Sequence, residues 1–220
     1  MLLLIDNHDS FTHNLAHLLA LAWKEPVVAR VDKVDPGALP GHRPEALILS
    51  PGPGRPRQCR GLWEILAACA GQMPILGICL GHQAIGEWLG MKLVRAPRPV
   101  HGHAVPLRHS GLGLFAGCPP DLSVARYHSL VLSGCGAMPL PAVAGPGLLV
   151  DAVCQPGLLM SLRHEQMGLW GLQFHPESFL SDAGPLMIRN FRRHAASFRP
   201  IGAKAIPSGS SCGRGPNLPH

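Results

Sequence analysis

The chain of 220 residues is long enough to form one domain with a substantial buried core. Hydrophobic residues make up 46% of it and charged residues 15%, a balance that excludes a largely disordered protein. The net charge of +6 comes from scattered arginines without an aromatic and basic stripe. This distribution argues against nucleic-acid binding and favours a mildly basic surface suited to an acidic partner.

The first residues and the cysteines bear on the compartment. The apolar run Met-Leu-Leu-Leu-Ile is broken by Asp6, and it lacks the basic region and cleavage site of a signal peptide. No apolar run is long enough to cross a bilayer, so we expect a cytoplasmic protein without membrane attachment. The seven cysteines form no C-x-x-C pair, which argues against a zinc site and a disulfide framework.

The first half of the chain alternates between strand and helix patterns. Apolar runs predict strands at 2–5, around Val27, Val28 and Val31, at 46–49 and at 74–78, and helical spacing predicts helices at 11–23, about 61–71 and about 80–89. Ser10 is the candidate cap of the first helix. This alternation predicts an α/β fold with a parallel sheet and helices on both faces.

The second half has a different character. Short strands are predicted around 91–95, 104–107, 122–125, 149–153, 158–163 and 169–174, and they either extend the sheet or form a small antiparallel flap. A last helix is expected at about 183–197. Beyond Pro200, Gly, Ser and Pro predominate, so we expect one domain over residues 1–198 and a disordered tail over 199–220.

Cys79 lies in the most distinctive motif, where an apolar strand runs into G-x-C-x-G and a helix follows. This is the setting of a nucleophile elbow, with cysteine where hydrolases carry serine. The helix N-terminus favours the thiolate, and its N–H groups can face a developing oxyanion. A lone motif of this kind is also compatible with a small buried cysteine, so a nearby base is needed to support catalysis.

His175 is the best of the thirteen histidines for that role. It ends an apolar strand, and Pro176 keeps its backbone extended. Glu177 is close enough in sequence to hold the imidazole tautomer, as the third member of a triad does. We interpret His82, on the elbow helix, as structural. His101, His103 and His109 lack the carboxylates or cysteines that would complete a metal site.

Ser50-Pro51-Gly52-Pro53-Gly54 must be a loop, since this density of Pro and Gly permits no regular structure. It follows a parallel strand, so we expect it at the same sheet edge as Cys79. A backbone without side chains can approach a ligand closely, which makes Gly54 a candidate oxyanion donor. A plain turn is the alternative interpretation of this loop alone.

Together these residues resemble the class I (triad) glutamine amidotransferases, and more narrowly the glutaminase subunit of anthranilate synthase and aminodeoxychorismate synthase. The resemblance spans about residues 2–196. The cysteine elbow and His175-Pro176-Glu177 mark the superfamily. Two segments point to the chorismate-using branch, namely Asp9-Ser10-Phe11-Thr12 and Arg126-Tyr127-His128-Ser129-Leu130.

The resemblance implies a three-layer α/β/α flavodoxin-like fold with a mainly parallel sheet. It implies a Cys79, His175 and Glu177 triad and an oxyanion hole from the backbone of Gly54 and Leu80. Residues implied to bind L-glutamine are Gly52, Gln83, Ser129 and Leu130. No cofactor or metal is expected, and the ammonia would pass to a separate component I synthase chain in a heterodimer or heterotetramer.

Two positions depart from the family pattern, since His8 stands where an aromatic residue is usual and His103 where Lys is usual. Neither belongs to the implied triad, and both bear on partner contacts. Two other functions are compatible with the sequence, a glutaminase for guanylate, cytidylate or carbamoyl phosphate synthesis, and a non-catalytic interaction subunit. Whether anthranilate or aminodeoxychorismate is the product is left open by the sequence.

Overall fold

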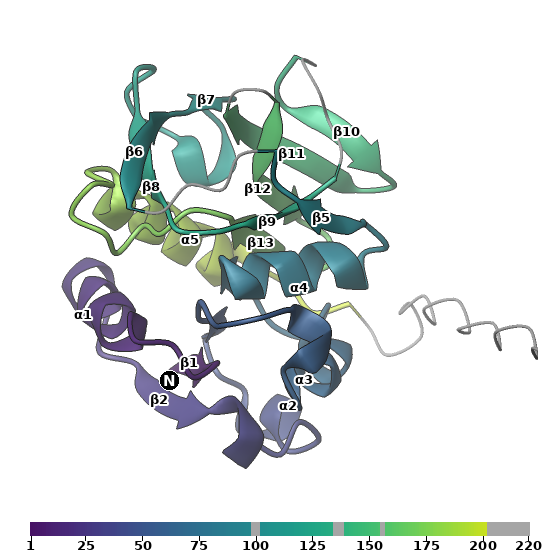
Figure 1. The fold of residues 1–220 in the computed structure, drawn as a ribbon. Helices are drawn as coiled ribbons and strands as arrows, with labels where there is room; N and C mark the ends of the chain where they lie inside the picture. The colour runs from purple at the N-terminus through teal and green to yellow at the C-terminus, as the bar shows by residue number, and fades with distance from the viewer. Residues whose placement is uncertain (98–101, 134–138, 155–156, 202–220) are drawn as a thin grey trace, which may run out of the picture.

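Parallel strands form the centre of the structure, a computed structural model that describes residues 1–97, 102–133, 139–154 and 157–201 (Figure 1). Their spatial order is β13-β4-β3-β1-β2, and every neighbouring pair is parallel. The bounds are β1 Leu2–Asp6, β2 Val27–Arg30, β3 Ala46–Leu49, β4 Ile75–Ile78 and β13 Leu169–Leu172. The predicted parallel sheet is therefore confirmed.

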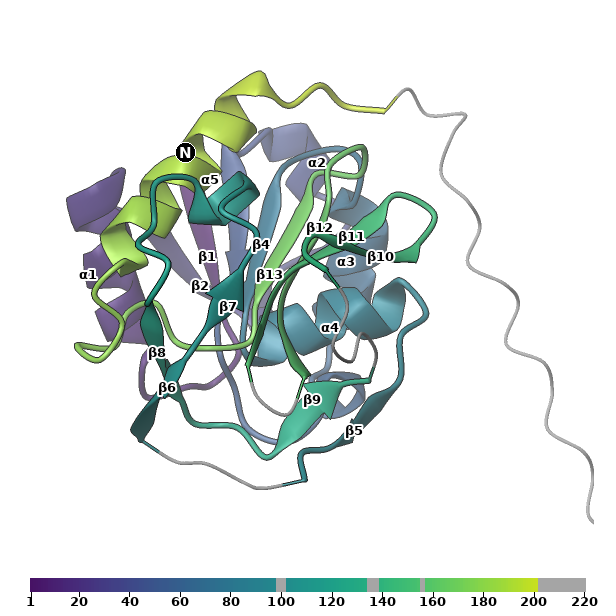
Figure 2. The ribbon, with the colours of Figure 1, turned by 90° about the horizontal axis from the view of Figure 1, so that it is seen from above.

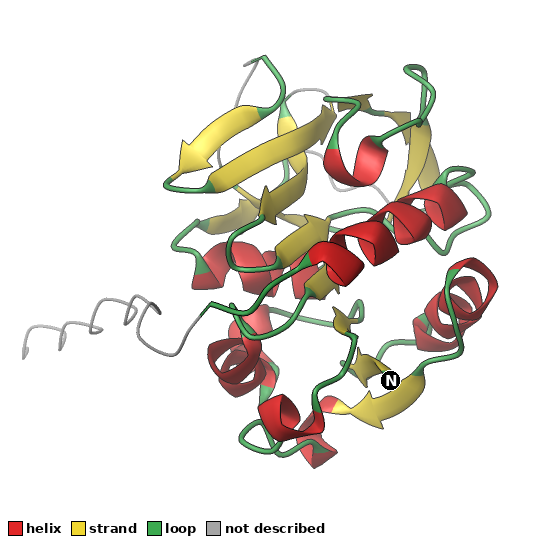
Figure 3. Cartoon of the chain, turned by 180° about the vertical axis from the view of Figure 1, so that it is seen from behind, coloured by secondary structure: helices red, strands yellow, loops and turns green. Residues whose placement is uncertain are grey.

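The second half of the chain does both things that the sequence left open. It extends the main sheet with antiparallel strands, in the order β10-β11-β12 next to β13, with β7 on β11. It also forms two small two-stranded sheets, β5 with β9 and β6 with β8. The bounds are β5 Leu93–Arg95, β6 His103–Pro106, β7 Arg108–His109, β8 Ser123–Arg126, β9 Leu130–Leu132, β10 Ala142–Gly145, β11 Leu148–Cys154 and β12 Leu158–His164. This strand-rich half is at the top of Figure 3.

Helices cover both faces of the sheet, and the alternation of side chains along β1 explains how. Leu2 and Leu4 belong to a core with the helices α1 and α5, whereas Leu3 and Ile5 belong to a second core with α3 and α4. Figure 2 shows the two groups of helices on opposite sides of the sheet. The helices are α1 Thr12–Ala22, α2 Leu39–His42, α3 Leu62–Cys69, α4 Leu80–Trp88 and α5 Gly184–Ser197, with 3-10 turns η1 Val31–Lys33, η2 Pro56–Gln58 and η3 Gly113–Phe115. None of the described helices is long and apolar enough to span a membrane.

Some local expectations were wrong. Ser10 does not cap α1, because the carboxylate of Asp9 accepts the hydrogen bond from the Phe11 N–H at 2.7 Å. Val31 starts the turn η1 and does not continue β2. The strand before His175 ends at Leu172, so His175 lies in the loop that follows. Most of the expected tail, residues 202–220, lies outside the described residues.

Candidate active site

Cys79 lies in a strained turn between β4 and α4. Its backbone has φ 49° and ψ −97°, a conformation that non-glycine residues rarely adopt and that is common at functional sites. The neighbouring glycines make this turn possible. A Cβ on Gly77 would overlap the backbone of Gly81, and a Cβ on Gly81 would lie 2.5 Å from the carbonyl oxygen of Leu49. The elbow therefore needs glycine at both flanking positions.

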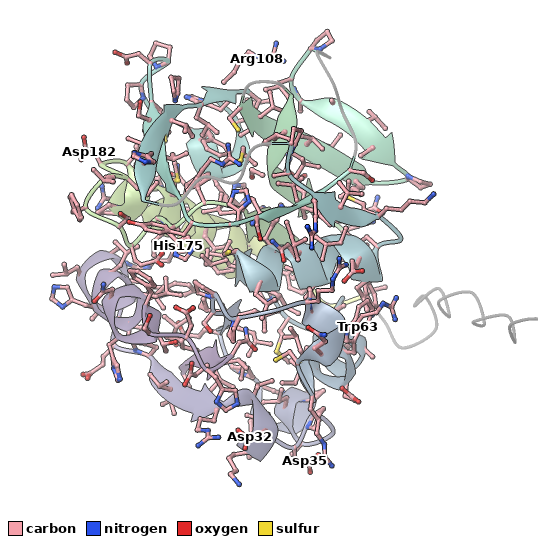
Figure 4. All side chains as sticks on the ribbon, viewed as in Figure 1. Asp32, Asp35, Trp63, Arg108, His175 and Asp182 are labelled. Carbon is pink, nitrogen blue, oxygen red and sulfur yellow. The ribbon has the colours of Figure 1, made fainter. Side chains whose placement is uncertain are left out.

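His175 and Glu177 form a close pair in the loop after β13. The His175 Nδ1 lies 2.6 Å from the Glu177 Oε1, and the two side chains are 4% and 0% exposed. Such a short contact in a buried setting is typical of a charge-assisted hydrogen bond. In Figure 4, His175 lies where the N-terminal half meets the strand-rich half of the molecule.

The charge state of His175 is set by its two neighbours. Burial alone would lower the pKa of His175, but hydrogen bonds and charges of Cys79 and Glu177 outweigh it and raise this pKa to about 10. His175 is therefore an imidazolium at neutral pH, hydrogen-bonded to the Cys79 thiol group on one side and to the Glu177 carboxylate on the other. This arrangement is suited to a thiolate nucleophile and a proton-donating imidazolium.

Two aromatic rings enclose the imidazole. Phe11 and Tyr127 both meet the His175 ring edge-on, with centroids 5.6 and 5.0 Å away, and their own rings are 5.4 Å apart. Asp9 contributes indirectly because its carboxylate holds the backbone of Phe11. The two segments that the sequence associated with the chorismate-using branch thus converge on His175.

The loop residues predicted around the substrate lie at a cavity next to the elbow. Gly54, Ser129 and Leu130 line this cavity of about 500 Å³, together with Arg55, Gln58, Arg95 and Ala96. Leu80 is the first residue of α4, directly after Cys79. Gly52 lies beneath the loop, where an added Cβ would lie 2.6 Å from the Leu80 side chain. Cys79 itself does not line this cavity.

A chain of amides links the cavity wall to the nucleophile. The amide nitrogen of Gln83 donates to the Leu130 carbonyl at 3.1 Å and to the Oε1 of Gln173 at 3.2 Å. The nitrogen of Gln173 donates in turn to the Cys79 Sγ at 3.7 Å. Gln173 was not among the site residues predicted from the sequence. Its place two residues before His175, on the same chain segment, was the available signal.

The remaining histidines behave differently from His175. His82 is entirely buried in α4, and burial, followed by the charge of His128, lowers its pKa to about 3, which agrees with a structural role. His103 is exposed on β6, His109 lies on β7, and His101 is outside the described residues. Over the described ranges, no group of three or more His, Cys, Asp and Glu side chains could hold a metal ion.

The position where the family carries an aromatic residue is on the surface. His8 is exposed, has a positive φ of 62°, and its Nε2 lies 3.5 Å from the Asp32 Oδ1. This contact places it away from the imidazole of His175 and beside η1. Cys59, Cys69, Cys118 and Cys154 are free thiols whose pKa is raised by burial, which makes them less reactive than an unburied thiol.

Comparison with known proteins agrees with this geometry. The chain is 40% identical over 191 residues to aminodeoxychorismate synthase component 2 of Escherichia coli, covering 87% of this chain and 98% of that protein. It is 38% identical over 199 residues to anthranilate synthase component 2 of Pseudomonas aeruginosa, covering 90% and 98%. It is also 45% identical over 195 residues to aminodeoxychorismate synthase of Streptomyces griseus, covering 86% of this chain and only 25% of that longer protein.

The fold has a solved counterpart. The crystal structure of a GMP synthase subunit from Thermoplasma acidophilum superposes with a TM-score of 0.75, covering 89% of this chain and 94% of that one at 21% identity. At this identity the likeness concerns the fold alone. The family model for glutamine amidotransferase class-I matches residues 3–195, which include the elbow, the His175–Glu177 pair and both aromatic residues around it. The chain therefore belongs to the class I glutamine amidotransferases.

Proposed function

We propose that this chain is a glutaminase subunit that hydrolyses L-glutamine and delivers the ammonia to a chorismate-using synthase subunit. The observation that carries the proposal is the Cys79–His175–Glu177 arrangement, with a strained nucleophile, an imidazolium and a buried carboxylate in contact. The same arrangement speaks against a non-catalytic interaction subunit, which has no need of a strained cysteine beside a charged histidine.

Acyl transfer follows from these charge states. The Cys79 thiolate attacks the side-chain amide carbon of glutamine, and a C–S bond forms as the carbonyl oxygen takes the negative charge. The His175 imidazolium gives its proton to the leaving nitrogen, which departs as ammonia and leaves a glutamyl thioester. His175 is then neutral and takes a proton from water, whose oxygen attacks the thioester. Collapse of that intermediate releases glutamate and restores the thiolate and the imidazolium.

The developing oxyanion needs hydrogen-bond donors beside Cys79. We assign this role to the backbone N–H groups of Leu80, which opens α4, and of Gly54, on the loop that follows the neighbouring strand β3. A donor in an oxyanion hole is typically worth about 2.7–4 kcal/mol of transition-state stabilisation. Their position at one sheet edge, in adjacent parallel strands, supports the assignment.

Glutamine itself is assigned to the cavity that Ser129 and Leu130 line, with Gly52 leaving room at the base of the loop. Gln83 uses both protons of its amide nitrogen on protein acceptors. Its carbonyl oxygen has no partner among the described residues and suits the ammonium group of the substrate. The amidotransferase domain is assigned to residues 1–198, in the cytoplasm, where glutamine and a synthase partner would meet.

The partner follows from the chemistry of the product. Ammonia in neutral water is mostly ammonium, which is no nucleophile, so the acceptor site must dock against the glutaminase. The component 2 relatives from Escherichia coli and Pseudomonas aeruginosa carry the names of aminodeoxychorismate and anthranilate synthases. We therefore propose a component 1 chain of this chorismate-using group as partner, in place of guanylate, cytidylate or carbamoyl phosphate synthases.

A Cys79→Ala variant tests the catalytic assignment. It should keep the fold, lose glutamine-dependent product formation, and still support synthesis by the partner when ammonia is supplied. Circular dichroism and assays with glutamine or ammonium salts would measure this. Glutaminase activity that persists in Cys79→Ala would refute the assignment.

A binding experiment tests the partner. The chain should elute with a component 1 synthase chain in size-exclusion chromatography, and the mixture should convert chorismate and glutamine to one aromatic amine. Identification of that amine decides between anthranilate and aminodeoxychorismate. A chain that remains separate from component 1 chains of both kinds would exclude this choice of acceptor.

A further inference from the structure

Gln83 and Gln173 lie in series between the cavity wall and the sulfur of Cys79. Gln83 is 3% exposed and Gln173 is fully buried, so both amides must be satisfied within the protein. The contacts run in one direction, from the Gln83 nitrogen to the Gln173 oxygen, and from the Gln173 nitrogen to the sulfur. The backbone N–H of Gln173 is fixed too, since it donates to the Met160 carbonyl on β12 at 2.9 Å.

This direction is determined by the first amide. Gln83 spends its two N–H groups on the Leu130 carbonyl and the Gln173 Oε1, so it presents only donors to Gln173. Rotating the Gln173 amide by half a turn would place two nitrogens against each other and an oxygen against the sulfur. Gln173 is therefore held with an N–H group toward Cys79.

We propose that Gln173 stabilises the thiolate form of Cys79 by hydrogen bonding, and that Gln83 is the positioning residue that keeps it in place. The inference rests on the proposed function only in taking Cys79 as the nucleophile. A hydrogen bond to an ionised acceptor is roughly twice as strong as one between neutral groups, so this donor favours thiolate over thiol. His175 acts on the same sulfur from another chain position, and the two donors together hold the nucleophile ionised and oriented.

A purely structural role makes a different prediction. If Gln173 only satisfied its own buried amide, its replacement would change the stability of the fold and leave the ionisation of Cys79 as it was. The pH dependence of Cys79 reactivity separates the two explanations, because the thiolate is the reactive form.

The titratable groups around the sulfur are known and stay unchanged in this test. His175 faces Cys79 directly, the charges of Glu177 and Asp9 act on His175, and the buried His82 lies on α4. Since the pKa of His82 is lowered to about 3, it remains neutral over the range of the experiment. A shift caused by replacing Gln173, which carries no charge, therefore reports the hydrogen bond.

The experiment measures alkylation of Cys79 by iodoacetamide over a range of pH from about 5 to about 10, followed by mass spectrometry of the peptide that carries it. Gln173→Met keeps the length of the side chain and removes its N–H groups. We expect the midpoint of the alkylation profile to rise by about one pH unit, the size expected for losing one hydrogen bond to a charged group. Gln83→Met, which leaves Gln173 in place without its anchor, should shift the midpoint in the same direction by less.

Gln72→Met is the matched control. Gln72 also donates from its amide, to the Ile201 carbonyl at 3.3 Å, but its partner lies outside the elbow, and its replacement should leave the midpoint unchanged. Gln83→Met carries the test if Gln173→Met does not fold. Midpoints equal to that of the wild type in the folded variants would overturn the proposal. Alkylation needs neither glutamine nor a partner, so a failed glutaminase assay would refute the proposed function without affecting this result.

Discussion

The ring of Tyr127 meets the imidazole of His175 edge-on, with the two centroids 5.0 Å apart. Phe11 makes a similar contact from the segment that precedes α1. Edge-on contacts of this kind restrict the rotation of the imidazole and exclude water from one side of it. The two segments that resemble the chorismate-using branch therefore supply the packing around the catalytic base as well as a surface.

Tyr127→Leu should lower the glutaminase kcat by roughly 3- to 10-fold with little change in KM, since an aromatic pair contributes about 0.5–1.5 kcal/mol beyond its buried area. Tyr127→Phe should restore most of the activity, because the ring makes the contact and the hydroxyl lies 3.4 Å from the Ser178 Oγ, at the edge of hydrogen-bonding range. Steady-state kinetics of both variants measure this. Equal losses in the two variants would assign the effect to the hydroxyl instead.

Glu177→Gln should move the alkaline limb of the glutaminase pH profile to lower pH by about one to two units. The pKa of His175 is about 10 in the presence of the Glu177 carboxylate, and removing that negative charge destabilises the imidazolium. The proton donor for the leaving ammonia is then lost at a lower pH. Glu165→Gln, on an exposed carboxylate that pairs with Arg163 at 2.8 Å, is the control and should leave the limb in place. An unmoved limb in Glu177→Gln would show that another group sets it.

Gly77→Ala should destabilise the fold by about 1–3 kcal/mol, because the added methyl overlaps the backbone of Gly81 and the elbow must shift. Alkylation of Cys79 should slow at the same time. Gly41→Ala is the matched control, since a Cβ there has nothing within 4 Å, and it should be neutral in thermal and urea denaturation. Similar stability losses in both variants would mean that the overlap at Gly77 is relieved without cost.

His82 should make the fold sensitive to acid. Burial, with the charge of His128, lowers the pKa of His82 in the folded state to about 3, whereas the unfolded imidazole has its ordinary pKa near 6.5. The unfolded state therefore binds a proton that the folded state does not, and the free energy of unfolding falls as the pH drops from about 6.5 toward 3. Urea denaturation at several pH values should show a weaker decline in His82→Leu. An identical decline in both proteins would contradict this.

The sequence by itself determined the parallel core and the identity of the nucleophile. Strand and helix patterns that alternate over residues 2–89 indicate an α/β sheet because each period reflects a local backbone geometry. The G-x-C-x-G motif is also local, since Gly77 and Gly81 are required by the turn that holds Cys79. The His175–Glu177 contact spans two residues and was predictable from their spacing.

Tertiary structure decided what depends on segments that are distant in the chain. Gln83 and Gln173 are 90 residues apart, and their contact exists only because β13 lies beside β4, which leads into α4. The short strands β9 and β10 were missed because such short segments carry no clear period and gain their hydrogen bonds from β5 and β11. Ser10 and Asp9 are both good caps by type, and only the path of the backbone brings the Asp9 carboxylate to the Phe11 N–H. Local patterns specify the elements, whereas the packing of the sheet places their side chains in contact.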